Sequence, residues 1–160
     1  MDFRQRLKKA ADRGDRARHE KDREAAARAM SEEECKQLHS QFRRGLTEYI
    51  EKCLEQLGDQ FPGFQFETIV DSQGWGAAVR RDDLGVTDGR RDNFFSRLQL
   101  LVSSFNEYHV LDLAAKGTIR NKETFTRSHF QRLDEVDPES FTELIDLWVL
   151  DYAELYASES

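Results

Sequence analysis

The spacing of apolar residues predicts a long helix in the N-terminal half of the chain. Between Ser31 and Gly58 apolar side chains recur every three or four residues, which is typical of one face of an α-helix. That face consists of Cys35, Leu38, Phe42, Leu46, Tyr49, Cys53 and Leu57, widened by Ile50 and Leu54. Ser31 followed by Glu34 matches a capping box, and Gly58 suits the position after a helix. We therefore expect the helix to begin at Ser31 and to end near Gly58.

Beyond Pro62 the apolar spacing falls to two, which is typical of β-strands. Residues 64–70 and 74–79 flank an Asp-Ser-Gln-Gly turn and predict a hairpin. A polar loop that contains glycine is expected from about residue 81 to 92. Residues 94–103 fit a strand or a helix. We favour the strand, because the next segment, 108–119, also fits a strand and requires a neighbour.

The C-terminal part predicts one more strand and one more helix. A turn at residues 120–123 leads into the strand TFTRSHFQRL. Asp137 suits the N-cap of the following helix, and Pro138 suits its first position. The apolar face of that helix consists of Phe141, Leu144, Ile145, Trp148, Tyr152 and Leu155. Residues 31–157 are thus expected to form one α+β domain: a long N-terminal amphipathic helix, an antiparallel four- to five-stranded meander, and a C-terminal helix packed on the sheet.

Residues 1–30 differ from this domain in both pattern and charge. Their composition favours a helix, but the apolar stripe is thin, and a lone helix of this kind is marginal in water. Residues 1–28 contain ten Lys and Arg against six Asp and Glu, a net charge of +4. The rest of the chain has fourteen against twenty-five, a net charge of −11. We therefore expect residues 1–30 to be a charged, mobile helical arm that becomes ordered on a partner.

Six of the ten cations of this arm are candidate partner contacts: Arg4, Lys8, Lys9, Arg13, Arg16 and Arg18. Three interpretations remain open. The arm is an exposed helix without a site, an element for protein docking or a coiled coil, or a salt-sensitive binder of nucleic acid. Six interleaved acidic residues, and the lack of an aromatic residue other than Phe3, weigh against nucleic acid.

Composition narrows the class of protein. Eleven Phe residues are incompatible with disorder of the whole chain. Cys35 and Cys53 on one helix would lie roughly 27 Å apart along its axis, so we expect them to be reduced. No secretory signal and no membrane-spanning apolar run is visible, so a cytoplasmic protein without a membrane partner is expected.

No sequence motif with specific chemistry is present, and we predict no catalytic residue, metal ligand or cofactor. The candidates for a ligand or partner surface are Trp75, His109, Arg127 and His129. Trp75 lies between two glycines, which allow close approach of another chain. The two histidines fall on neighbouring predicted strands. Either they form a site together, or they are two ordinary residues of the sheet.

The stretch KGTIRNKETFTRSHFQRLDEVDPESFTELIDLWVLDYAELYA resembles a family of small conserved bacterial proteins of unknown function. The resemblance covers the chain from about Gln41 onward. It implies no activity, cofactor or catalytic residue. From the residues alone we expect a non-enzymatic protein-interaction or adaptor module that binds a protein partner or itself. The alternatives are a small-molecule-binding domain or enzyme with a pocket between sheet and helices, and a nucleic-acid accessory protein that acts through the arm.

Overall fold

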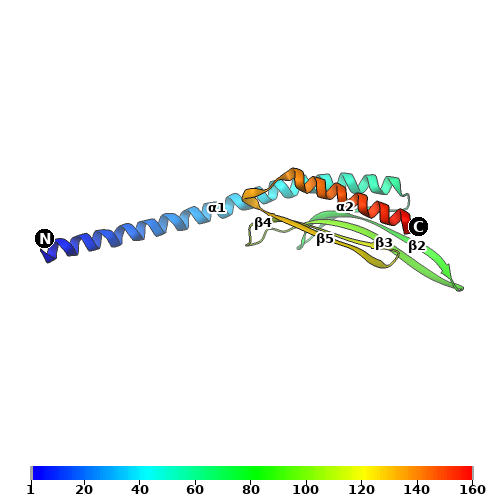
Figure 1. The fold of residues 1–160 in the computed structure, drawn as a ribbon, viewed down its shortest axis with the longest axis horizontal. Coiled ribbons are helices and arrows are strands. Elements are labelled where there is room, and N and C mark those ends of the chain that lie inside the picture. The colour runs from blue at the N-terminus through cyan, green and yellow to red at the C-terminus, as the bar shows by residue number, and fades with distance from the viewer. Residues whose placement is uncertain (1, 160) are drawn as a thin grey trace. The chain divides into compact units, whose positions relative to one another are not determined.

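The structure is a computed structural model, and it describes residues 2–159 without the side chains of residues 26–31, 87 and 124 (Figure 1). Its elements are α1 (Phe3–Gln60), β1 (Gln65–Val70), β2 (Gly74–Thr87), β3 (Arg90–Ser103), β4 (Val110–Ile119), β5 (Lys122–Arg132), a 3₁₀ turn (Leu133–Glu135) and α2 (Pro138–Glu159). The chain divides into two compact units, residues 1–37 and 38–160, and each is described by itself.

The larger unit is a two-layer α+β domain. Its five strands pair antiparallel in chain order, from β1 at one edge to β5 at the other. The C-terminal part of α1 and the whole of α2 lie on one face of this sheet (Figure 1). The predicted α+β class, the meander and the C-terminal helix on the sheet are confirmed. The strand over residues 94–103, which we favoured over a helix, is confirmed as part of β3.

The core lies between the two helices and this face of the sheet. Helix α1 contributes Leu46, Ile50, Leu54 and Leu57, and α2 contributes Phe141, Ile145, Trp148, Val149, Tyr152 and Tyr156. The strands add Ala77, Val79, Leu98, Leu100, Val102, Leu111, Leu113, Ala115 and Phe125. Burying each large apolar side chain contributes about 1.5–3 kcal/mol, so this interface holds the two helices to the sheet.

Two predicted turns are confirmed, and their side chains explain their shape. In the β1–β2 turn the Asp71 carboxylate accepts hydrogen bonds from the amides of Gln73 and Gly74, at 2.8 and 3.2 Å. In the β4–β5 turn Arg120 and Asn121 have positive φ, at 47° and 72°. Asparagine tolerates this conformation, and the Asn121 side chain also accepts a bond from the Phe95 amide at 2.8 Å.

The loop predicted from about residue 81 to 92 is wrong. Strands β2 and β3 continue through this region and meet at a tight turn formed by Asp88 and Gly89, with φ of 53° and 77°. An Asp-Gly pair readily adopts the two positive φ angles that a two-residue hairpin turn requires. Because β1 pairs with β2 only as far as Arg80, the outer part of this hairpin is a two-stranded ribbon. Two apolar side chains on it, Leu84 and Val86, are exposed.

The predicted start of the long helix at Ser31 is also wrong. Helix α1 begins at Phe3 and its backbone is helical through Ser31. The Ala, Arg, Lys and Glu residues upstream favour a helix, and this propensity outweighs the capping signal. The Ser31 side chain lies outside the described residues. The division into an arm over 1–30 and a domain over 31–157, and the mobility of the arm, remain predictions.

The N-cap of α2 is confirmed. The Asp137 carboxylate accepts a hydrogen bond from the amide of Glu139 at 3.2 Å, and Pro138 takes the first helical position. The amide of Asp137 donates in turn to the side-chain oxygen of Gln131 at 2.8 Å. The start of α2 is therefore fixed to the end of β5, and this sets which face of the helix turns toward the sheet.

Candidate functional site

In the smaller unit, every side chain from residue 2 to 25 is exposed. Phe3 and Leu7 are 78% and 58% exposed, which is unusual for residues of this size. They begin an apolar stripe with spacings of 4, 3, 4 and 3, the repeat of a coiled-coil surface. The stripe consists of Phe3, Leu7, Ala10, Gly14 and Ala17. We call these five residues the apolar stripe.

Arginines flank the apolar stripe on both sides. A 3.6-residue helical period places Arg4 and Arg18 along one side and Arg6 and Arg13 along the other. Three of the predicted arm contacts, Arg4, Arg13 and Arg18, therefore border an apolar surface. The other three, Lys8, Lys9 and Arg16, lie on the outer face of the helix, away from the stripe.

Some of these cations already have neighbours within the helix. Arg18 forms an exposed ion pair with Asp15 at 3.5 Å, and such pairs are worth little in water. Arg6, Lys9, Arg13 and Arg16 line a shallow hollow along one side of the helix. The segment thus presents positive charge beside apolar surface, an arrangement that suits an acidic protein surface with an apolar centre.

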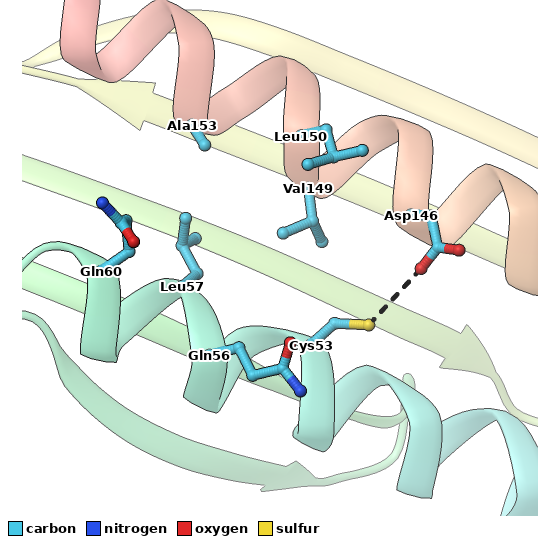
Figure 2. A pocket seen from close by; sticks show the side chains of 8 residues that line it. All are labelled: Cys53, Gln56, Leu57, Gln60, Asp146, Val149, Leu150 and Ala153. Carbon is cyan, nitrogen blue, oxygen red and sulfur yellow. Dashed lines mark hydrogen bonds between the residues drawn. The ribbon is translucent and has the colours of Figure 1, made fainter.

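The larger unit contains an open groove of about 290 Å³ between α1 and α2 (Figure 2). We call it the helix groove. It is lined by Cys53, Gln56, Leu57 and Gln60 of α1 and by Asp146, Val149, Leu150 and Ala153 of α2. Its floor is largely apolar, and Leu150 on its rim is 66% exposed. Figure 2 shows the side chains of the two helices facing one another across it.

Two lining residues of the helix groove, Cys53 and Asp146, belong to a polar cluster with Tyr49. The Tyr49 hydroxyl donates a short hydrogen bond to Asp146 Oδ1, and the Cys53 thiol lies 3.8 Å from the same oxygen. The bond to Asp146 raises the pKa of Tyr49, and burial, with Asp146 nearby, raises the pKa of Cys53. Both groups therefore stay protonated near neutral pH. A protonated thiol is a poor nucleophile, so the cluster favours binding over covalent chemistry.

Helix α2 brings negative charge to this groove, while Lys52 of α1 lies close enough to Cys53 to influence it electrostatically. Helix α2 carries six acidic residues and no Lys or Arg: Glu139, Glu143, Asp146, Asp151, Glu154 and Glu159. Glu143, Leu147, Leu150 and Glu154 follow one another at spacings of 4, 3 and 4, so they share one exposed face. Two exposed leucines of α2, Leu147 and Leu150, therefore form an apolar row beside the groove. A glutamate lies about one helical turn beyond each end of this row.

None of the four residues predicted as a ligand or partner surface lines the helix groove, and Trp75 lies far from His129. Trp75, Val102, Leu113 and His129 occupy one row across four strands. Three strand spacings separate Trp75 from His129, a distance of about 14 Å. The Arg43 guanidinium covers the Trp75 ring at 3.7 Å. The His129 ring packs edge-on against Phe141 at 5.1 Å.

The other two predicted residues also have separate surroundings. The guanidinium of Arg127 lies over the ring of Phe125 at 4.4 Å. His109 stacks on Phe105 at 5.6 Å and has a positive φ of 52°. The structure thus places Arg127 and His129 on one face of β5 and Trp75 on the same face of the sheet, in β2. His109 lies just before β4, outside the strand that the sequence predicts for it. These four residues remain predictions.

The glycines beside Trp75 have an explanation within the chain. A Cβ on Gly76 would lie 1.9 Å from the carbonyl oxygen of Leu100, and one on Gly74 would lie 2.2 Å from that of Val102. The close approach that these glycines permit is therefore made by β3.

Sequence reasoning missed the helix groove because it assigned Tyr49 and Cys53 to the apolar face of a helix. A contact between the two helices beside the groove joins Tyr49 to Asp146, which are 97 residues apart. A usable signal was the charge of α2, which has carboxylates and exposed leucines but no cation.

Among the described residues, no group of three or more His, Cys, Asp and Glu is placed to hold a metal ion. Neither described helix has an apolar stretch that could span a membrane. Comparison with protein-family models, with curated proteins and with solved structures found no match to this chain. Membership of the bacterial family that the C-terminal stretch resembles therefore remains a prediction.

Proposed function

We propose that the protein is a self-associating interaction module, in which the N-terminal helical segment of one copy docks on the acidic body of another. The observation that carries this proposal is the apolar stripe, exposed along its length and flanked by four arginines. A helix whose side chains are all exposed gains little stability from side-chain packing. Covering Phe3 and Leu7 would supply about 1.5–3 kcal/mol for each side chain fully buried.

Charge decides what kind of surface the stripe suits. In a parallel pair of two stripes, Arg13 of one copy would face Arg18 of the other; in an antiparallel pair, Arg6 would face Arg13 and Arg4 would face Arg18. Either orientation brings like charges together, so the expected coiled coil between two arms is disfavoured. The unit formed by residues 38–160 has thirteen Lys and Arg against twenty-two Asp and Glu, a net charge of −9. The body of a second copy therefore complements the arm.

The experiment that tests this function is light-scattering mass across a concentration series, at low and high salt. The wild-type chain is expected at a mass of two chains or more at low salt and nearer one chain at high salt, because salt screens the attraction. A chain with Phe3→Ser and Leu7→Ser is expected to stay at the mass of one chain. The matched control, Gln5→Ser with His19→Ser, changes the outer face of the same helix and is expected to behave as wild type.

A wild-type chain that keeps the mass of one chain at the highest concentration would overturn the proposal. So would a Phe3→Ser, Leu7→Ser variant that associates as wild type does. Adding a single-stranded oligonucleotide separates the rival function. If the arm binds it with a steep salt dependence and the chain does not self-associate, nucleic acid is the ligand.

A further inference from the structure

We propose that the apolar stripe of one copy docks in the helix groove of a second copy, with its arginines against the carboxylates of α2. This inference rests on the proposed self-association and names the surface that receives the arm. A helix laid into an apolar groove between two helices is a common mode of recognition. Both surfaces are partly apolar, and their charges are opposite in sign.

The groove supplies the apolar half of this contact. Leu57, Val149 and Leu150 line it, and Leu147 continues the apolar surface on α2 at 51% exposure. An exposed row of this kind, with a hollow beside it, suits a few large anchoring side chains. In the apolar stripe, only Phe3 and Leu7 are of that size, and they lie one turn apart, so both can enter one groove.

The small residues of the stripe suit the same surface. Ala10, Gly14 and Ala17 present no bulk to the partner helix, and a Cβ on Gly14 would meet no atom within 4 Å in the chain itself. Small residues along one helix face let a partner helix approach closely, and that approach brings the flanking arginines near its carboxylates. The stripe is thus narrow enough to enter a groove between two helices.

Carboxylates supply the polar half. Glu143 and Glu154 are exposed at the two ends of the apolar row on α2, and Asp146 lies inside the groove. Because α2 has no Lys or Arg, no cation on that helix opposes the approach of Arg6 and Arg13. Elsewhere on the body, acidic residues such as Asp82 and Asp134 have arginine neighbours in sequence. The helix groove therefore brings apolar surface and carboxylates together.

The test is a set of charge-reversal substitutions in the full chain. Sedimentation measures, for each variant, the dissociation constant for self-association. Glu143→Lys with Glu154→Lys is expected to weaken association by about tenfold or more. The control, Glu123→Lys with Asp134→Lys, makes the same change in net charge at exposed positions away from the groove. It is expected to weaken association by less than about threefold, because it reduces only the long-range attraction, which salt screens.

Reciprocal reversal then tests the pairing directly. Arg6→Glu with Arg13→Glu is expected to weaken association to a similar degree. Combining these two changes with Glu143→Lys and Glu154→Lys should bring the dissociation constant back to within about threefold of wild type, since attraction is restored with the signs exchanged. Lys8→Glu with Arg16→Glu reverses two cations on the outer face of the helix instead. Combining this pair with Glu143→Lys and Glu154→Lys should not restore the wild-type dissociation constant. Circular dichroism and thermal unfolding confirm that each variant is folded.

The outcomes separate this inference from the function on which it rests. If the groove variant and its control weaken association equally, or if the combined variant is not rescued, the groove is not the receiving surface. In that case, the loss of association in the Phe3→Ser, Leu7→Ser variant would still support self-association through the arm. If the wild-type chain does not associate at all, both proposals fall.

Discussion

His39 lies on α1 with 2% of its surface exposed, and its ring donates a hydrogen bond to the carbonyl of Ser103 at 3.0 Å. Its other contact in the core is an edge-on packing against Phe105 at 5.7 Å. Burial lowers the pKa of His39, and the nearby charge of Arg43 lowers it further, against a smaller opposing effect of the Ser103 bond. The folded chain therefore keeps this imidazole neutral at a pH where an exposed one takes up a proton.

This environment predicts a stability loss in mild acid. Below about pH 6.5 the unfolded chain binds a proton at His39 before the folded chain does, so the free energy of unfolding falls as the pH drops toward the folded-state pKa. Above that range both states are neutral there and the contribution is complete. His39→Gln should flatten the acid limb of a plot of unfolding free energy against pH, measured by urea titration. The exposed-residue control His19→Gln should leave the limb unchanged, and an unaltered slope in His39→Gln would refute this role.

At the scale of single elements, the pairing of β2 with β3 depends on a close backbone approach. Because a Cβ on Gly76 would meet backbone atoms of Leu100 and Leu101, the side chain cannot be accommodated by a rotamer change. On α1 the opposite holds for Gly45, where an added Cβ meets nothing within 4 Å. The close approach of β3 therefore requires a glycine at position 76, whereas nothing in the surrounding structure requires one at position 45.

This contrast predicts opposite effects of the same substitution. Gly76→Ala should lower the free energy of unfolding by about 1–3 kcal/mol, as overpacking does. Gly45→Ala should raise it by about 1 kcal/mol, because alanine is the better residue inside an exposed helix. Chemical denaturation measures both. A Gly76→Ala chain as stable as wild type would show that β3 can move away from β2 without cost.

The elements also show which parts of the fold the sequence predicts. Periodicity alone placed the face of α1 around Ile50, and capping residues placed the start of α2 at Asp137 and Pro138. The predicted loop over residues 81–92 misses the outer hairpin, because it contains Asp88 and Gly89, a pair that favours a tight turn between two strands. Local patterns give the type of an element more reliably than its ends.

The candidate site was less predictable than the fold. The exposed arm and its arginines follow from composition and spacing, which are local properties. The helix groove depends on how two distant helices pack, and no local pattern states that Tyr49 will meet Asp146. In the same way, His129 lies on β5 as predicted, but His109 lies outside the strand predicted for it, just before β4 and with a positive φ of 52°. The two rings pack against different aromatic residues.

At the scale of the whole molecule, the uneven distribution of charge has a consequence for association. A basic segment and an acidic body in one chain attract between copies, and this attraction raises association rates most at low salt. Each chain offers one apolar stripe and one helix groove. A chain that loses one of the two surfaces keeps the other, so two differently altered chains can still bind each other.

Mixing two such variants is the most direct measurement of arm-to-groove docking between copies. The first, Phe3→Ser with Leu7→Ser, keeps the groove; the second, Leu150→Glu, keeps the arm and changes a side chain that is already exposed. Light-scattering mass should show each variant alone as a single chain and their equimolar mixture as a complex of one chain of each. A mixture that keeps the mass of a single chain, with both variants folded, would contradict docking of the arm in the groove.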